Sequence, residues 1–438
     1  LFLLAKVYSF SHDPLQREFG VSYYQQLAQS FPDNSLADDA LFWAGDILER
    51  NQKYDSALAH YLIEVSLFSS ADFTPESYWR LAWIQYKRQK YDSALSWLDI
   101  IIQSHHNTAW FSSQETSRAL FWKSKILELL ENKEGSKQAR KELLQKFPGQ
   151  FYSFYTWFYL RSAKEYENDL MSYSHSSPSF SVLKDYHTLS DSFESIKTIR
   201  NLIEKDIIIL ARKALDFTIF IEANSLSDSR NLQELAMYHC LTQNYYESSW
   251  MLRKQIPLWF DDPPSFQNVS WWKCSYPIVH KDIVYRQAKT NTLDPFLILG
   301  LMREESALKE NIISWAGAIG LMQLMPATAK EQSEKMKLPF DINRLIDPDY
   351  NITLGSAYLK RISGILSDLR FPEYVLAVGA YNGGPGNMKL WTQQSQTVSL
   401  DEFIEEIPYE ESRNYVKRVL SSYFTYKLLY DHKKVLSV

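Results

Sequence analysis

Residues 294–326 read DPFLILGLMREESALKENIISWAGAIGLMQLMP, and this stretch predicts a buried helix that carries Glu305, followed by a segment rich in turns and glycine. Asp294 suits the cap of a helix, since its side chain can accept hydrogen bonds from the first free amides, and Pro295 suits the first helical position. Residues 296–302 are almost all apolar, which predicts a helix that is buried on most sides. Helical spacing places Glu305 on the same stripe as these apolar residues, so its side chain is expected to face the core.

A carboxyl group in that position is a candidate general acid. Burial disfavours the charged form and therefore raises the pKa of Glu305, which is what proton donation near neutral pH requires. The alternative is structural, because a glutamate on an apolar helix is most often half-exposed or paired with an arginine, and Arg303 is nearby. The helix alone favours the structural alternative, and the rest of the chain favours the catalytic one.

The composition is that of a globular protein with a large core. The chain has 438 residues, of which 45% are hydrophobic and 23% charged, enough for two or three domains. Aromatic residues make up 15%, and their helical spacing favours packing between helices over stacking on sugars. The net charge of -5 provides no general attraction to nucleic acid or to an anionic membrane surface, so neither is an expected partner.

Cysteine spacing and hydropathy predict neither a metal site nor a membrane span. The two cysteines, Cys240 and Cys274, lack metal-ligand spacing, and the sequence leaves open whether they pair. No run of about 18 apolar residues occurs, so no transmembrane helix is expected. Residues 1–4 are all apolar, which is compatible with the end of a trimmed signal or anchor segment.

A repeated segment organises the first part of the chain. QKYDSAL at residues 52–58 recurs at residues 89–95, an offset of 37 (52 to 89), and looser copies run over residues 121–139 and 243–248. Aromatic pairs precede the first two copies. This pattern is typical of tetratricopeptide-like helix pairs, which stack into a curved solenoid because no single pair can bury its apolar face.

Glycine use and breaks in periodicity divide the chain into three expected domains. Of the 13 glycines, four precede Gly300 and nine lie from there onward, so tight backbone corners gather in the last part. A serine-rich segment at 172–182 and prolines within 257–264 mark the breaks. The expected domains are helical repeats at 1–170, a further helical solenoid or linker at 171–276 and a last domain at 277–438. Strand-like alternation is nowhere strong, so the predicted fold class is all-α.

The glycine-rich segment at residues 314–326 allows its backbone to approach another group closely. Its small residues leave room beside the chain, while Met322 and Gln323 supply a soft apolar wall and an amide that can donate and accept. The alternative is a structural turn with a core methionine.

Two later stretches present polar side chains at helix ends. AYNGGPG at residues 380–386 predicts a helix whose last turn presents Tyr381 and Asn382, followed by a glycine stop and a proline that starts the next helix. IPYEESRNYV at residues 407–416 places acid, arginine and tyrosine at the start of the final helix. The structural alternatives are a plain corner between helices and a capped helix with a surface ion pair.

Taken together, these four stretches resemble the soluble lytic transglycosylases of glycoside hydrolase family 23, whose catalytic domain has a goose-lysozyme-like fold. The resemblance covers about residues 277–430 and includes Asn351, Gly355 and Tyr358. The helical repeats resemble the superhelical part of the large members of this family. The resemblance implies an α-solenoid followed by a lysozyme-like, α-helical catalytic domain at 277–438.

The resemblance also implies the site residues. Glu305, in the Glu-Ser motif, matches the single catalytic acid. The matching glycan-contacting or acid-contacting residues are Ser306, Ser314, Met322, Gln323, Tyr381, Asn382, Glu411 and Tyr415. Among these, Tyr381 matches the tyrosine that touches the catalytic carboxylate.

Four positions depart from the family pattern. Glu304 stands where glutamine is usual, which adds a charge next to the acid. Trp315 stands where proline is common, Gly383 where alanine is common, and Ser412 replaces threonine. None of these changes removes a catalytic group, but Trp315 is expected to reshape one sugar subsite.

The resemblance implies cleavage of the β-1,4 bond between N-acetylmuramic acid and N-acetylglucosamine in peptidoglycan, with 1,6-anhydro-muramic acid ends and one glutamate acting as acid and then base. The alternatives are a goose-type muramidase that hydrolyses the same bond and a catalytically silent, glycan-binding repeat scaffold. Expected partners are peptidoglycan strands and, through the repeats, cell-wall proteins. No metal or organic cofactor is expected. The resemblance places the protein outside the bacterial cytoplasm, in the periplasm or cell envelope.

Overall fold

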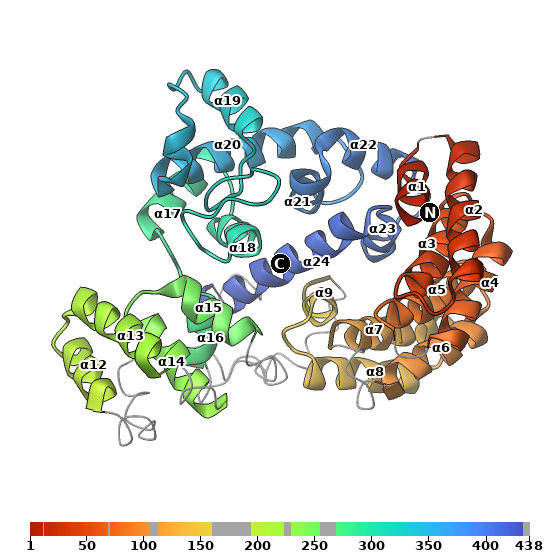
Figure 1. Cartoon of the computed structure of the whole chain (residues 1–438), viewed down its shortest axis with the longest axis horizontal. Coiled ribbons are helices and arrows are strands. Elements are labelled where there is room, and N and C mark those ends of the chain that lie inside the picture. The colour runs from red at the N-terminus through yellow and green to blue at the C-terminus, as the bar shows by residue number, and fades with distance from the viewer. Residues whose placement is uncertain are drawn as a thin grey trace. The chain divides into compact units, whose positions relative to one another are not determined.

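The computed structural model describes residues 1–11, 13–68, 71–104, 113–159, 194–222, 229–254 and 269–431. Within these ranges every regular element is a helix, and the only strand-like pairing is two isolated bridges, Ile313 to Ile319 and Ile319 to Leu324. The all-α prediction is therefore confirmed. The chain divides into two compact units, Leu1–Tyr159 and Leu160–Val438 (Figure 1).

The first unit is a row of helix hairpins. Its helices are α1 (Phe2–Ser9), α2 (Pro14–Ser30), α3 (Ala37–Arg50), α4 (Tyr54–Leu67), α5 (Thr74–Lys87), α6 (Tyr91–Ser104), α7 (Ser113–Leu129), α8 (Lys133–Lys146) and α9 (Phe151–Tyr159). Gln52, Gln89 and Glu131 have a left-handed backbone in the turns of the pairs α3–α4, α5–α6 and α7–α8. Gln243 has the same conformation in the second unit. All four sequence repeats thus contain the same left-handed turn before their second helix.

Aromatic rings fill much of the core of the first unit. Trp79, Trp122, Tyr24, Tyr61 and Phe121 are each at most 2% exposed. Their role is packing between helices, as their spacing along the sequence favoured.

Before residue 277, the described part of the second unit contains the helices α12 (Glu194–Glu204), α13 (Ile208–Glu222), α14 (Ser229–Leu241), α15 (Tyr245–Lys254) and α16 (Val269–Ser275). A disulfide between Cys240 and Cys274 joins the end of α14 to α16, which answers the question that the sequence left open. The predicted breaks at 172–182 and 257–264 lie outside the described residues. The three-domain division at residues 170 and 276 stays a prediction.

The remaining elements of the second unit are α17 (Lys281–Asn291), α18 (Pro295–Ser306), α19 (Pro326–Lys335), η4 (Ile342–Ile346), α20 (Pro348–Leu366), α21 (Glu373–Gly383), α22 (Pro385–Gln394), α23 (Leu400–Glu406) and α24 (Glu410–Tyr430). Helix α18 packs along α24, and α21 packs against both α20 and α24 (Figure 1). The two ends of the 277–438 segment are therefore brought together around one buried helix.

The sequence signals at the start of α18 act as predicted. The Asp294 carboxylate accepts a hydrogen bond from the backbone N–H of Phe296 at 2.9 Å, and Pro295 occupies the first helical position. Residues 296–303 are all buried.

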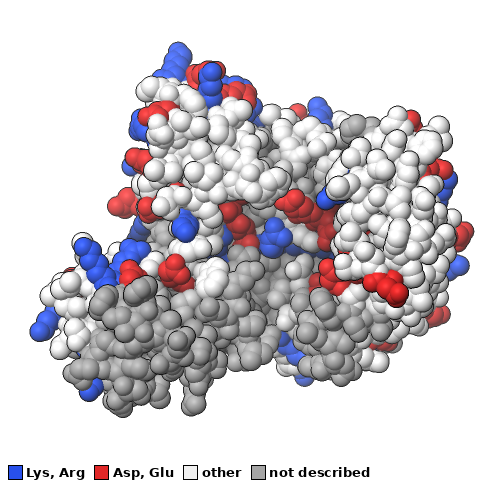
Figure 2. Space-filling view, in the orientation of Figure 1, with Lys and Arg blue, Asp and Glu red and all other residues white. Residues whose placement is uncertain are grey.

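No helix in the described part of the chain is long and apolar enough to cross a bilayer. On the face drawn in Figure 2, acidic and basic side chains are interspersed over the described surface rather than gathered in one basic patch.

Gly300 permits the close contact between α18 and α24. A Cβ atom at this position would lie 2.9 Å from the backbone nitrogen of Tyr423, closer than such atoms can approach. Any larger residue therefore forces the two helices apart.

We predict that G300A destabilises the second unit by about 2 kcal/mol, because the added methyl group overpacks the α18–α24 contact. G364A is the matched control: Gly364 lies in α20 with no atom near its would-be Cβ, so alanine is expected to stabilise by up to about 1 kcal/mol. Denaturant unfolding of both variants checks this. Equal effects of the two substitutions would contradict the tight contact.

Candidate active site

Glu305 lies in the last turn of α18, and Ser306 fixes how that turn ends. The Ser306 hydroxyl donates to the carbonyl of Met302 at 2.9 Å and accepts from the N–H of Leu308 at 3.2 Å. The helix stops there because Ala307 and Leu308 both take a left-handed backbone. Ser306 is itself buried, so the structure gives it a positioning role, and its predicted contact with glycan stays a prediction.

Glu305 is held by a tyrosine from α24. The Tyr415 hydroxyl donates to Oε1 of Glu305 at 2.5 Å. Burial is the main cause that raises the pKa of Glu305 to about 7; the nearby carboxylates of Glu304 and Glu411 raise it further, while the Tyr415 hydrogen bond and the Arg418 charge lower it. The carboxyl group therefore titrates in the range that was expected from its place on the helix.

Arg303 does not neutralise Glu305. Its guanidinium lies 2.9 Å from the Oε1 atom of Glu304, donates to the carbonyl of Ser275 at 3.0 Å and lies 3.9 Å from the ring centroid of Tyr276. The structural alternative, in which Arg303 pairs with Glu305, is thus not what the structure shows.

A glycine-rich turn, residues 312–324, follows α18 in the sequence. The side chain of one asparagine binds its backbone. Asn351 of α20 accepts from the N–H of Met322 at 2.8 Å and donates to the carbonyls of Ile319 (3.0 Å) and Leu345 (2.8 Å). One buried amide therefore ties the turn to α20 and to η4.

Met322 anchors the glycine-rich turn in the core. Its side chain is fully buried and packs against Gly355 of α20, where a Cβ atom would clash with the Met322 sulfur. Its carbonyl accepts a hydrogen bond from the Tyr381 hydroxyl at 2.8 Å. The side chain therefore contributes to the core, as the structural alternative expects, and the predicted contact of Met322 with glycan stays a prediction.

Gln323 and Ser314 brace the same turn. The Gln323 amide donates to the carbonyl of Gly320 at 2.8 Å, and the Ser314 hydroxyl accepts from the N–H of Ala318 at 3.0 Å. Trp315, the residue after Ser314, is fully exposed. Contacts of Gln323 and Ser314 with glycan stay predictions.

Tyr381 was expected to touch the catalytic carboxylate, but the structure gives the hydrogen bond with Glu305 to Tyr415. The Tyr381 hydroxyl donates instead to Met322, which links α21 to the glycine-rich turn. Burial and the nearby Glu305 carboxylate raise the pKa of Tyr381 far above its usual value, so its hydroxyl stays protonated.

Asn382 and Glu411 lie at the outer edge of this cluster. The Asn382 side chain accepts from the Ser412 hydroxyl at 2.7 Å, which joins the end of α21 to the start of α24. Glu411 is exposed in the first turn of α24. The structure thus brings together side chains from α18, α21 and α24, with the glycine-rich turn attached through Tyr381.

Sequence reasoning missed two residues of this cluster, Arg418 and Ser422. Arg418 lies 3.8 Å from Glu304, and the Ser422 hydroxyl donates to Glu304 at 2.7 Å. Their spacing could have identified them, because residues three and seven positions after Tyr415 lie on the same face of a helix as Tyr415.

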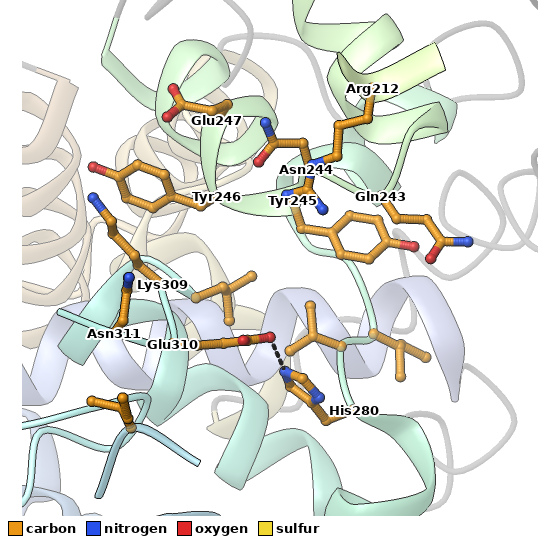
Figure 3. Close-up of a pocket in the computed structure, with 14 residues that line it drawn as sticks. Arg212, Gln243, Asn244, Tyr245, Tyr246, Glu247, His280, Lys309, Glu310 and Asn311 are labelled. Carbon is orange, nitrogen blue, oxygen red and sulfur yellow. Dashed lines mark ion pairs between the residues drawn. The ribbon is translucent and has the colours of Figure 1, made fainter. Parts of the chain in front are cut away.

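A separate pocket of about 790 Å³ lies elsewhere in the second unit (Figure 3). It is lined mainly by residues 243–247, 278–280 and 308–311, and an ion pair between His280 and Glu310 (3.0 Å) spans its floor. None of the nine predicted site residues lines it. Among the described residues, no group of three or more His, Cys, Asp or Glu side chains is placed to hold a metal ion.

Residues 282–404 match the family described as the transglycosylase SLT domain. These residues form an SLT domain. It includes α18 with Glu305, the glycine-rich turn and α21, whereas Tyr415 lies beyond the matched range.

Relatives of known name match the same region. The soluble lytic murein transglycosylase of Escherichia coli K12 is 31% identical over 156 residues, which cover 34% of this chain and 24% of that protein. A putative soluble lytic murein transglycosylase of Haemophilus influenzae is 38% identical over 133 residues, 30% of this chain and 22% of that protein. The matches span about a quarter of the length of these relatives.

Solved structures extend the likeness beyond the SLT domain. An inactive mutant of lytic transglycosylase Slt from Pseudomonas aeruginosa superposes with a TM-score of 0.63 and 26% identity, covering 97% of this chain and 61% of that one. A 70-kDa soluble lytic transglycosylase in complex with bulgecin A has a TM-score of 0.59 at 19% identity over the same shares, which shows the fold alone. The prediction of an all-α chain with a lysozyme-like domain is confirmed.

The raised pKa of Glu305 predicts a pH-dependent stability difference between the wild-type protein and E305Q. Between about pH 4.5 and 7 the unfolded chain loses this proton while the folded protein keeps it, so wild-type stability falls relative to E305Q as the pH rises, by about 3 kcal/mol in total. Below this window both states are protonated, and above it both are ionised, so the difference is constant there.

Denaturant unfolding of both proteins at several pH values measures this slope. E334Q, which changes an exposed glutamate of α19, is the control and is expected to show no such slope. A difference between wild type and E305Q that is constant from pH 4.5 to 8 would show that Glu305 is not desolvated.

Proposed function

We propose that this chain is a lytic transglycosylase that cleaves the β-1,4 bond between N-acetylmuramic acid and N-acetylglucosamine in peptidoglycan. The observation that carries the proposal is Glu305: a single carboxyl group of an SLT domain, with a pKa of about 7 and a hydrogen bond from Tyr415. The names of the matched relatives, soluble lytic murein transglycosylases, support the substrate class.

In the first step, Glu305 acts as general acid. Because Tyr415 donates to Oε1, the catalytic proton is carried on Oε2, which delivers it to the glycosidic oxygen. The bond from this oxygen to C1 of the muramic acid breaks, and N-acetylglucosamine leaves with a free 4-hydroxyl group. The N-acetyl group of the muramic acid stabilises the sugar cation from within the substrate.

In the second step, Glu305 acts as general base. Its carboxylate accepts the proton of the C6 hydroxyl of the same muramic acid while that oxygen bonds to C1. The product is a 1,6-anhydro sugar, no water is consumed, and Glu305 ends protonated and ready for the next cycle. One residue can serve both steps because its pKa lies near neutral pH, where both of its forms are accessible.

The surrounding residues have supporting parts in this proposal. Tyr415 orients the carboxyl group. The proposed glycan contacts remain Ser306, Ser314, Met322, Gln323, Asn382 and Glu411. Trp315, exposed at the glycine-rich turn, offers a flat apolar face to a sugar ring. Domain roles are proposed as repeats at 1–170, a helical linker region at 171–276 and a catalytic domain at 277–438.

We also propose that the protein works in the periplasm or cell envelope and that the repeats of the first unit bind glycan strands or cell-wall proteins. The Cys240–Cys274 disulfide supports this location, since disulfides form and persist in oxidising compartments. The matched relatives named as membrane-bound lytic murein transglycosylases support an envelope location as well.

We predict that E305Q loses at least about a thousandfold in turnover of purified peptidoglycan while it still binds glycan, because glutamine keeps the shape but cannot cycle a proton. Mass spectrometry of the released muropeptides is the measurement, and E334Q serves as the matched control with wild-type activity expected.

The product mass separates this proposal from its rivals. Products lighter by one water than hydrolysed muropeptides support the transglycosylase. Hydrated products would identify a muramidase, and glycan binding without any release would identify a scaffold. Turnover by E305Q close to that of the control would refute the role of Glu305.

The pH dependence of activity follows from the same carboxyl group. Only protonated Glu305 can donate, so kcat/KM is expected to be level below pH 7 and to fall about tenfold for each pH unit above it. Initial rates on peptidoglycan between pH 5 and 9 measure the profile. A constant kcat/KM from pH 6 to 9 would contradict proton donation by a group with this pKa.

A further inference from the structure

The last turn of helix α18 carries two adjacent glutamates whose side chains have different partners. The side chain of Glu304 is only 2% exposed, and Oε1 accepts from Arg303 at 2.9 Å and from Ser422 at 2.7 Å. Arg303 is 3% exposed as well. A nearby arginine and a hydroxyl donor favour the ionised form of a carboxyl group, whereas Glu305 beside it has no arginine within ion-pair distance.

Arg418 connects the two carboxyl groups. It lies on α24, three residues after Tyr415, and its Nε atom is 3.8 Å from Oε2 of Glu304. Its side chain is 42% exposed, so it is free enough to take another position. The same guanidinium acts on Glu305, since its charge lowers the pKa of that carboxyl group. One exposed cation thus lies next to Glu304 and acts through its charge on Glu305, and an ionised carboxylate attracts it more strongly than a protonated one.

This inference rests on the proposed role of Glu305 in the reaction. We propose that Glu304 is a positioning residue whose buried carboxylate holds the Arg418 guanidinium away from Glu305 and so keeps the catalytic carboxyl group in its acid form. Glutamine at position 304 would have the same shape without the charge, so E304Q isolates the effect of the carboxylate.

The other charged and titratable groups that face Glu305 are accounted for. Tyr415, Arg418 and Glu411 face it from α24, and Tyr381 faces it from α21. Glu411 is exposed at the start of α24 and is therefore screened by solvent. Glu304 and Arg418 are the pair that can redistribute charge at the carboxyl group.

A purely structural role for Glu304, as the counter-ion of Arg303, predicts a different result. In that case E304Q lowers the stability of the fold, and the pH profile shifts only through the direct loss of the Glu304 charge, by the same amount with or without Arg418. The dependence of the shift on Arg418 is therefore the readout that distinguishes positioning from structure.

The test is a double-mutant cycle on E304Q and R418Q, with kcat/KM on peptidoglycan measured from pH 5 to 9. E304Q is expected to move the midpoint of the profile down by about one pH unit, because the Glu304 charge is lost and Arg418 is released towards Glu305. R418Q is expected to move the midpoint up. In the R418Q background, E304Q is expected to move it clearly less than in the wild type, since no guanidinium is left to release.

Two results would overturn the proposal: no shift in R418Q, or an equal shift by E304Q in both backgrounds. R418Q changes a partly exposed side chain, so it reports on the proposal even where E304Q folds poorly. Arg303 and Ser422 keep a hydrogen-bond acceptor in E304Q, which limits that risk.

A second measurement separates failure of this inference from failure of the proposed function. The pH-dependent stability difference between each variant and the same variant carrying E305Q reports protonation of Glu305 without any turnover. A wild-type protein that releases no muropeptides refutes the proposed function, while this stability difference still tests the link from Glu304 to Glu305. If the pH range of this stability difference is the same in E304Q, R418Q and the wild type, the link from Glu304 to Glu305 is refuted, while the proposed function is not.

Discussion

The close packing of α18 against α24 is the contact on which the rest of the candidate site depends. Gly300 lets the two backbones approach, and polar contacts then follow along the whole interface. Asp294 at one end accepts from Tyr423 at 3.0 Å, and Glu305 at the other accepts from Tyr415 at 2.5 Å. The carboxyl group is desolvated because it ends a helix that is buried on most sides, and it is oriented because its partner belongs to the helix packed against it.

Two neighbouring glutamates receive different partners through this packing. Glu304 has a buried arginine and a hydroxyl donor, which favour its ionised form, while burial favours the acid form of Glu305 against the opposing effect of the Tyr415 hydrogen bond. Environments that push the pKa values of adjacent groups apart are a common feature of acid-base catalysis. Arg303 contributes by being held at Glu304 and Tyr276, where it cannot neutralise the carboxyl group of Glu305.

The glycine-rich turn shows that a matched motif can serve the fold as well as the substrate. Met322 fills the core beside Gly355, Asn351 binds the backbone of the turn, and Gln323 braces it from within. Several residues expected to contact glycan therefore shape the turn. Trp315 is left outside, fully exposed, where a ligand can reach it.

Local chemistry alone determined the all-α class, the capped start of α18, the apolar face that carries Glu305 and the repeated hairpin turns of the first unit. These features depend on periodicity and on residues a few positions apart, so they can be deduced from the chain as written. Tertiary structure decided that Tyr415 rather than Tyr381 binds Glu305, that Arg303 pairs with Glu304, that Met322 faces the core and that Cys240 pairs with Cys274. Most of these choices depend on which of several equally suitable partners, distant in sequence, is brought within reach by helix packing, and the spacing of residues along the chain does not contain that information.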